Sequence, residues 1–247
     1  MSISEKLTII AENVPKVYDS GYATGSYEGK LEQYNMFWDG FQQNGTRTNY
    51  EYAFAHGFPV GDFPPKYSMQ PTSANSMFEC SGSGNLAQSL KDKGITLDTS
   101  NCTKLGNTFF HTGITHLPTI DVSQAVQLSF TFASENIVEI EKIIMSENNI
   151  NSYTFHYTSN LEKMIIEGTI GRGNFSFAHA KKLSKESIVS IINALSSSTS
   201  GLNVTVSLTA VNKAFESASG KADGSTSSEW TSLVASKSNW TIALADA

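Results

Sequence analysis

The sequence predicts an α/β-type repeat solenoid, in which short parallel strands from successive units stack against one another. Three observations predict it. An aromatic anchor recurs at a nearly fixed interval, and apolar residues follow each anchor at similar offsets. Some of these residues form β-branched runs typical of short strands, such as Ile140-Glu141-Lys142-Ile143-Ile144. Charged residues make up only 16% of the 247 residues, because Ser, Thr, Asn and Gly are frequent, as many turns require.

Phenylalanine anchors define the repeat. Four of them are separated by 23, 23 and 22 residues: Phe109, Phe132, Phe155 and Phe177. An earlier, irregular unit is predicted to begin at the anchor Phe78, 31 residues before Phe109. The excess over one period predicts an inserted helical stretch over residues 86–93. We expect the five anchors to fill the interior between layers, because no single unit buries its own apolar face.

Residues 1–43 are predicted to form a helical, coiled-coil-like arm. Its apolar residues follow the 4-3-4-3 spacing of a coiled-coil seam: Ile3, Leu7, Ile10, Val14 and Val17. Pro15 lies inside this pattern and should end or kink the first helix. We expect the arm to mediate self-association. The alternative is an N-terminal helix that folds back onto its own domain.

Residues 44–76 are predicted to form a loop-rich aromatic cap at the start of the repeats, which extend over residues 77–182. The segment is rich in aromatic residues, and Asn44-Gly45 and Pro64-Pro65 are turn chemistry. A cap is expected because the terminal unit of a repeat array exposes an apolar end. The alternative is an aromatic platform for a ligand.

Residues 183–247 are predicted to form an α+β C-terminal cap that continues the sheet. Ser184 is placed as the N-cap of a helix with Glu186 in its first turn. The alternating residues 202–208 predict a strand. Two further helices, over 211–215 and 230–235, and a last strand over 240–244 complete the cap.

Composition and charge exclude several classes of partner. The net charge of -6 argues against nucleic acid, and the only basic cluster, Lys181-Lys182 with Lys185, is expected to be a solvated face. No signal peptide and no run of about 18 apolar residues is visible, which predicts synthesis in the cytoplasm without membrane insertion. The two cysteines, Cys80 and Cys102, are expected to be free thiols.

No pattern of residues predicts a catalytic site, a metal site or a cofactor. The segment 82–87 matches a dinucleotide fingerprint, but no strand precedes it. His111, His156 and His179 follow anchors closely and suggest a metal-binding or proton-sensitive row, which Ala133 interrupts; surface histidines in turns are the commoner case. A binding surface is expected on the sheet face or on exposed aromatic residues, with Tyr153 and Tyr157 as candidates.

The repeat resembles the BspA-type leucine-rich repeats, through residues 97–103, an aromatic anchor, and then Ile114-Thr115-His116-Leu117-Pro118-Thr119-Ile120-Asp121. Tyr18-Asp19-Ser20-Gly21-Tyr22 and Ser238-Asn239-Trp240-Thr241 are similar to leucine-rich-repeat proteins carried by phages and prophages of gut Firmicutes. The resemblance implies a short, curved leucine-rich-repeat array that binds partners and performs no chemistry of its own.

The resemblance also implies a role and a location. It favours a non-enzymatic phage structural or binding protein in the tail or baseplate of the virion, where receptor binding is one expected role. Its partners would be copies of itself, other virion proteins or a cell-surface receptor. The alternative is a bacterial surface or secreted adhesin that binds a host protein or glycan; adhesins of this kind carry a secretion signal and long repeat arrays, which are not seen here. A cell-wall hydrolase is a third, disfavoured hypothesis, because no isolated pair of acidic residues is found.

Overall fold

The computed structural model describes residues 49–55, 68–81, 88–92, 94–147, 153–172, 175–216 and 224–247. The chain divides into two compact units, Met1–Arg47 and Thr48–Ala247, and the described residues all belong to the second. The predicted arm with Ile3, Leu7, Ile10, Val14 and Val17 lies outside them and stays a prediction. The finer division at 44–76, 77–182 and 183–247 also stays a prediction.

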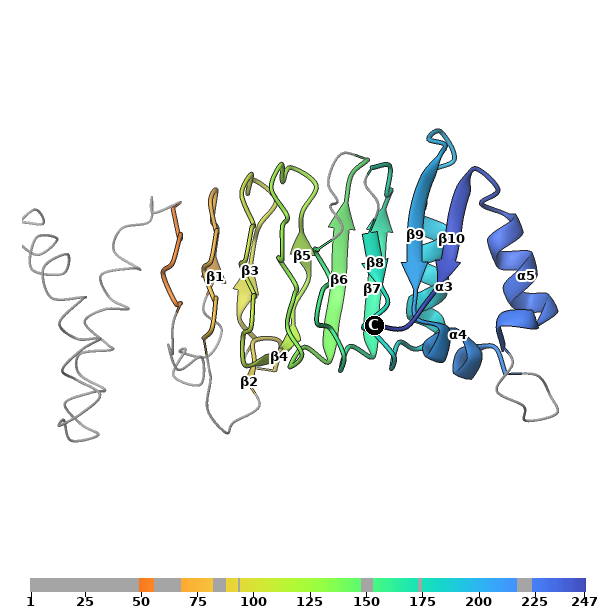
Figure 1. The fold of residues 1–247 in the computed structure, drawn as a ribbon. Coiled ribbons are helices and arrows are strands. Elements are labelled where there is room, and N and C mark those ends of the chain that lie inside the picture. The colour runs from red at the N-terminus through yellow and green to blue at the C-terminus, as the bar shows by residue number, and fades with distance from the viewer. Residues whose placement is uncertain are drawn as a thin grey trace, which may run out of the picture. The chain divides into compact units, whose positions relative to one another are not determined.

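The described residues have mixed α/β structure, as the repeat pattern predicts (Figure 1). The strands are β1 (Ser68–Met69), β2 (Gln88–Ser89), β3 (Thr96–Leu97), β4 (Ile114–Leu117), β5 (Ile120–Asp121), β6 (Glu139–Met145), β7 (Lys163–Gly168), β8 (Phe175–Phe177), β9 (Leu202–Val206) and β10 (Trp240–Leu244). The helices are α3 (Lys185–Ala194), α4 (Leu208–Ala214), the short 3-10 helix η2 (Gly224–Thr226) and α5 (Ser228–Ala235).

Every pairing between these strands is parallel, which confirms the predicted strand direction. One sheet has the order β2-β4-β6-β5, and β7 also pairs with β6. A second has the order β10-β9-β8, and β1 pairs with β3. Parallel neighbours need a crossover connection, and the remainder of each repeat unit provides it. In Figure 1 the strands therefore follow one another in nearly the order of the sequence.

The anchor phenylalanines stack in a single row, which we call the phenylalanine column. The ring centroids of Phe78 and Phe109 are 5.5 Å apart, and those of Phe109 and Phe132 are 5.9 Å apart. Phe155 lies 5.3 Å from Phe132, and Phe177 lies 4.5 Å from Phe155. All five side chains are buried. The spacing read from the sequence thus corresponds to one ring for each unit.

The column begins one unit earlier than the sequence indicates. Phe54 is fully buried and its ring stacks on Phe78 at 5.4 Å. It lies 24 residues before Phe78, in a segment that we assigned to an aromatic cap. The backbone around it pairs with the next unit, since the Phe54 N–H donates to the Met77 carbonyl at 2.8 Å. Residues 49–55 therefore add a ring to the phenylalanine column and pair with the backbone of the segment that follows.

Backbone hydrogen bonds hold successive units in register. Three anchors donate their N–H to the carbonyl of the residue that precedes the next anchor: Phe78 to Thr108 at 2.8 Å, Phe109 to Thr131 at 2.9 Å and Phe132 to Thr154 at 2.9 Å. These threonines are buried, and their hydroxyls donate to carbonyls of the unit before: Thr131 to Leu105 and Thr154 to Leu128. The buried hydroxyls of these threonines are thus paired, as burial requires.

Aliphatic residues form the wall opposite the column. Ile140 on β6 pairs with Leu117 on β4 and with Met164 on β7. Ile143 likewise pairs with Ile120 on β5 and Ile166 on β7. These six side chains are buried, so the β-branched runs pack inward while the intervening residues face outward.

The predicted helical insertion over residues 86–93 is wrong where the structure describes it. Gln88–Ser89 forms β2, which pairs with β4. A tight turn follows, in which the Ile95 N–H donates to the Leu90 carbonyl at 3.0 Å and Gly94 adopts a φ of 66°. Leu90 is fully buried, so pairing with the next unit and burial of this leucine outweigh the local helix pattern.

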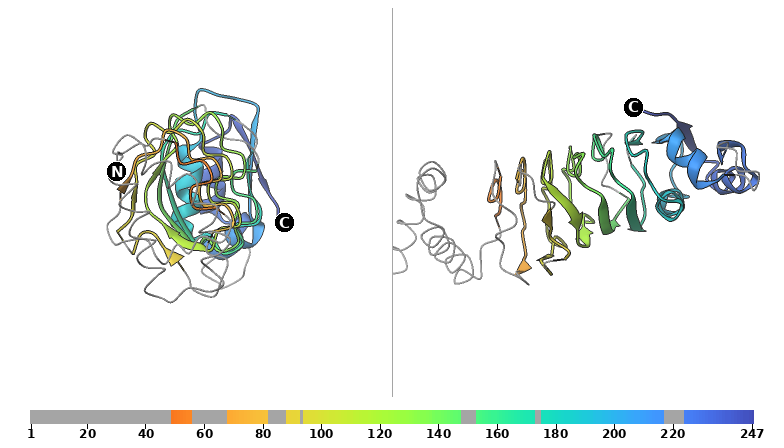
Figure 2. Two further views of the ribbon diagram at one scale, coloured as in Figure 1. Left: turned by 90° about the vertical axis from the view of Figure 1, so that its left-hand side faces the viewer. Right: turned by 90° about the horizontal axis from the view of Figure 1, so that it is seen from below.

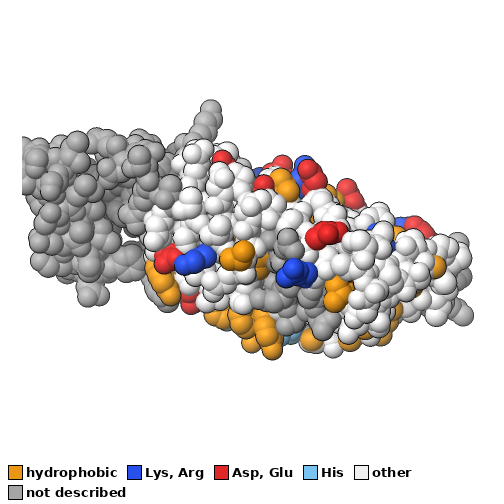
Figure 3. All heavy atoms as spheres, turned by 90° about the horizontal axis from the view of Figure 1, so that it is seen from above, with side chains coloured by type: hydrophobic (Ala, Val, Ile, Leu, Met, Phe, Trp, Pro, Cys, Tyr) orange, Lys and Arg blue, Asp and Glu red, His pale blue; other side chains and the backbone are white. Residues whose placement is uncertain are grey.

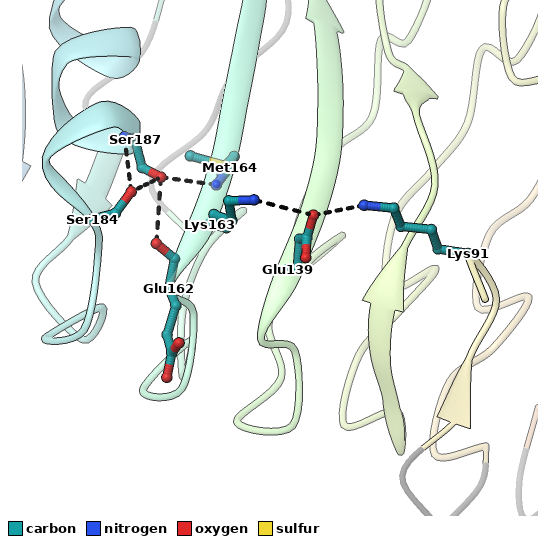
Figure 4. Close-up of polar contacts among 7 residues, drawn as sticks. All are labelled: Lys91, Glu139, Glu162, Lys163, Met164, Ser184 and Ser187. Atoms are coloured by element: carbon teal, nitrogen blue, oxygen red, sulfur yellow. Dashed lines mark hydrogen bonds and ion pairs between the residues drawn. The ribbon is translucent and has the colours of Figure 1, made fainter.

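Helix α3 ends the sheet at β7. The Ser184 side chain caps the helix, as predicted, by accepting a hydrogen bond from the Ser187 N–H. The Ser187 hydroxyl accepts the Met164 N–H at 2.9 Å, and the Ser190 hydroxyl accepts the Ile166 N–H at 2.8 Å. Figure 4 shows the first of these contacts. The serines of the helix thus satisfy strand N–H groups that another strand would otherwise pair with.

The C-terminal segment does not extend the sheet that contains β6 and β7 but forms a separate sheet on β8. Strands β9 and β10 extend from β8, which carries the last anchor, and α4 and α5 lie at this end of the described region (Figure 2). Leu208, predicted as the end of a strand, is instead the first residue of α4, because the Ser207 side chain caps that helix. Among the residues that the structure describes, no helix is both long and apolar enough to cross a bilayer.

Candidate functional site

Seven aromatic and histidine rings form a partly exposed cluster beside the phenylalanine column. They occupy positions one or two residues away from an anchor, and we name them the aromatic-histidine surface: Phe110, His111, Phe130, Tyr153, His156, Tyr157 and His179. Tyr153 is 51% exposed and Tyr157 is 42% exposed. In Figure 3, hydrophobic side chains gather along the lower edge of the molecule next to a histidine. Exposed apolar patches are often places where proteins bind partners, which makes this surface the candidate site.

Ring contacts fix the orientation of this surface. Phe130 and Tyr153 stack with centroids 5.1 Å apart and planes within 11°. His111 and Tyr157 stack at 5.5 Å and 24°. The rings of Phe110 and Phe130 meet edge to face, with their centroids 5.5 Å apart. Such pairs contribute about 0.5–1.5 kcal/mol each beyond area burial, so the rings are held in place before any partner arrives.

Two of the three histidines are direct neighbours. The rings of His156 and His179 lie 4.4 Å apart, whereas His111 stacks on Tyr157 instead. Ala133, which interrupts the histidine row in the sequence, is buried. Within the described ranges, no group of three or more His, Cys, Asp or Glu side chains is arranged to hold a metal ion.

The backbone at this surface has the geometry of the repeat itself. His111, Phe130 and Tyr157 adopt left-handed φ values of 48°, 56° and 60°. Ser76 and Asn107, at matching positions near other anchors, have φ values of 53° and 55°. A left-handed residue with a side chain costs roughly 1–2 kcal/mol. Because the conformation recurs from unit to unit, it belongs to the turn of each unit and is not specific to the site.

Polar groups surround the rings. His111 Nδ1 lies 3.3 Å from a Glu135 carboxylate oxygen. The Asn160 amide donates to the Glu135 carbonyl at 2.7 Å, and Lys182 Nζ donates to the Asn160 side-chain oxygen at 2.8 Å. Lys181 lies close enough to His179 for its charge to affect that imidazole. Histidines and lysines thus outnumber carboxylates in these contacts.

Burial and nearby positive charge act on His179. Burial, then His156 and Lys181, lower the pKa of the His179 imidazole from its ordinary value of 6.5. Because the folded state disfavours the charged imidazole, the free energy of unfolding is highest above pH 6.5 and falls as the pH drops from there towards the lower folded-state pKa. The folded protein therefore favours the neutral form of His179.

We expect His179→Gln to remove part of this acid sensitivity. Glutamine keeps hydrogen-bonding capacity but takes up no proton in this range. The unfolding temperature of the wild type, measured by circular dichroism at pH 7.5 and pH 5.0, should fall further than that of the variant. Similar unfolding temperatures at pH 7.5 would show that the fold is kept. An equal fall in both proteins would mean that His179 does not carry the effect.

The sheet face, the other surface considered from the sequence, pairs its charges internally. A Glu139 carboxylate oxygen lies 2.7 Å from Lys91 Nζ and 4.0 Å from Lys163 Nζ, as Figure 4 shows. The hydrogen bond from Lys91 lowers the pKa of Glu139. Lys142 and Glu167 pair at 2.7 Å on the neighbouring strands. Exposed ion pairs contribute little to stability, but they leave these charges already neutralised.

Neither cysteine has the properties of a nucleophile. Both are free; Cys102 is buried and Cys80 is half-buried. Burial raises the pKa of the Cys102 thiol to about 11 and also raises that of Cys80. Both groups are therefore thiols at neutral pH, whereas thiolates react. The glycine-rich segment 82–87 lies outside the described residues.

The structure places both predicted binding residues on one surface. The ring of His156 contacts both tyrosines. Its centroid lies 6.0 Å from that of Tyr153 and 4.1 Å from that of Tyr157. Phe110 and Phe130 were not singled out from the sequence, although both stand beside an anchor. Their position relative to the anchors was the available signal. No protein-family model, no curated protein and no solved structure matches the chain.

Proposed function

We propose that the chain is a non-enzymatic binding protein in which a short leucine-rich-repeat solenoid displays the aromatic-histidine surface. The phenylalanine column and the parallel pairing of successive units support the repeat array. The exposed, mutually stacked rings are the observation that carries the binding role. Binding needs only a fixed surface, and the hydrogen-bonded repeat units supply one.

The proposed setting is a phage particle, with the chain in the tail or baseplate. The resemblance to repeat proteins of phages and prophages supports this setting. Self-association through the arm over residues 1–43 is part of the proposal, because the seam of Ile3, Leu7, Ile10, Val14 and Val17 has coiled-coil spacing. Other virion proteins or a cell-surface receptor would be the remaining partners.

Purified particles test the setting. Particles banded from a culture that carries the gene should contain the chain in a constant ratio to tail proteins, as measured by mass spectrometry. Antibodies against the chain should label one end of the particle in electron micrographs. Absence from particles together with labelling of the bacterial surface would favour the adhesin alternative. Light scattering tests self-association, and a monomeric intact chain would contradict it.

A further inference from the structure

We propose that the aromatic-histidine surface binds a polypeptide segment that carries carboxylates beside apolar side chains, and that this binding strengthens as the pH falls from 7.5 to 5.5. The inference rests on the proposed binding function and names the class of partner. It is carried by the geometry of the rings, by the charges around them and by the coupling of the two histidines.

The ring arrangement favours apolar side chains over sugar rings. Phe130 and Tyr153 stack on each other, as do His111 and Tyr157, so each of these four rings has one face against its neighbour. A sugar ring packs on an open aromatic face. Because these rings stack on each other, less aromatic face is open to a sugar. Peptide side chains can pack between ring edges instead. Tyrosine is also enriched where proteins meet, because its ring packs while its hydroxyl forms a hydrogen bond.

The charges around the rings favour an anionic partner. The chain has a net charge of -6, yet His156, His179 and Lys181 lie together at this surface, and Lys182 contacts the Asn160 side chain. Two carboxylates belong to the neighbourhood. Glu135 contacts His111, and Asp246 lies close enough to Lys181 for their charges to interact while it accepts hydrogen bonds from Ser207 and Thr209. A partner with carboxylates would find opposite charge here, although the rest of the protein repels it.

Proton uptake couples binding to pH. His156 and His179 lie 4.4 Å apart, and Lys181 adds positive charge, so in the free protein the pKa of His179 is lowered. A partner carboxylate supplies the missing counter-charge and raises the pKa of this imidazole. Binding then takes up a proton, and the dissociation constant falls as the pH drops from the raised pKa of His179 in the complex towards its lowered pKa in the free protein. Glutamate side chains of a partner stay ionised at pH 5.5, since their ordinary pKa is about 4.3.

Fluorescence anisotropy with defined polymers tests the inference on the intact chain. The main probe is a fluorescein-labelled random copolymer of glutamate and tyrosine. Poly-L-glutamate lacks the apolar side chains, and polygalacturonate is an acidic polysaccharide. We expect the copolymer to bind most tightly, at least about fivefold tighter at pH 5.5 than at pH 7.5, where full coupling to one proton allows about tenfold per pH unit. His179→Gln should reduce this ratio.

Two tyrosines at matching positions provide the control. Tyr153 and Tyr52 each stand two residues before an anchor, and both are exposed. Tyr153→Asn should weaken binding of the copolymer about tenfold or more, whereas Tyr52→Asn should leave it unchanged. Circular dichroism at pH 5.5 would verify that each variant is folded. The tyrosine pair also keeps the test valid if His179→Gln fails to fold.

Several results would overturn the inference. Tighter binding of polygalacturonate would identify an acidic glycan as the partner class, and equal binding of poly-L-glutamate would remove the role of the rings. Equal losses in Tyr52→Asn and Tyr153→Asn would place the site elsewhere. Absence of binding to every probe would reject this partner class. None of these results bears on whether the chain is found in particles, so a failure here is distinct from a failure of the proposed function.

Discussion

Phe109→Ala should lower the free energy of unfolding by about 3–5 kcal/mol, the largest loss expected from a single truncation in this protein. The side chain is fully buried and stacks between Phe78 at 5.5 Å and Phe132 at 5.9 Å. Its removal leaves a cavity that hydrogen-bonded units on both sides cannot easily close. For a chain of this size, such a loss lowers the unfolding temperature by about 10 °C.

The next residue provides the matched control. Phe110 has the same side chain, but it is half-buried and its ring contacts Phe130 on the surface. Phe110→Ala should therefore cost about 1 kcal/mol, the contribution of one exposed aromatic contact. Urea unfolding of the intact chain, followed by far-UV circular dichroism, measures both. Equal losses in the two variants would mean that the column does not hold the units together.

The regular part of the fold could be predicted because its signal is repeated. Phe109, Phe132 and Phe155 recur at an interval of 23 residues, and the same interval separates Ile143 on β6 from its partners on β5 and β7. If one unit were placed out of register, its residues would no longer meet their partners at this interval. Spacing of this kind fixes which residues are neighbours, even though it says nothing about the loops between them.

Two features of the first units were missed. Phe54 is a column residue, but Tyr50, Tyr52 and other aromatic residues around it hide its periodicity. Residues 88–89 form a strand because they pair with β4 of the next unit. Local helix propensity takes no account of such a partner. In both segments the structure depends on packing against the neighbouring unit. That packing cannot be inferred from the local sequence.

The site could be predicted only in part for a related reason. Tyr153 and Tyr157 stand out as aromatic residues beside an anchor, and both are exposed. The offset from an anchor gives the place of a side chain in its unit, but the neighbouring unit decides which ring it meets. His156 contacts His179 across units, whereas His111 meets Tyr157 because Ala133 occupies the intervening position. Electrostatic coupling between histidines thus needs the three-dimensional register.

The second large effect is expected at Gly168, the last residue of β7. Its φ is 95°, and it pairs with Met145 on β6. A Cβ atom at this position would lie 2.2 Å from the Met145 carbonyl oxygen. Because that oxygen belongs to the backbone of the adjacent strand, it cannot move without disturbing the pairing. Gly168→Ala should therefore lower the free energy of unfolding by about 2–5 kcal/mol, from the positive φ and the overlap together.

Gly201 separates the two causes. Its φ is also positive, at 74°, but an added Cβ atom would meet nothing within 4 Å. Gly201→Ala should therefore cost only the conformational part, about 1–2 kcal/mol. Urea unfolding gives both losses, and hydrogen exchange should show faster exchange in β6 and β7 for Gly168→Ala alone. If the two variants lost the same stability, the close approach of β7 to the β6 backbone would contribute nothing, and the register between these strands would have to tolerate a side chain at their closest point.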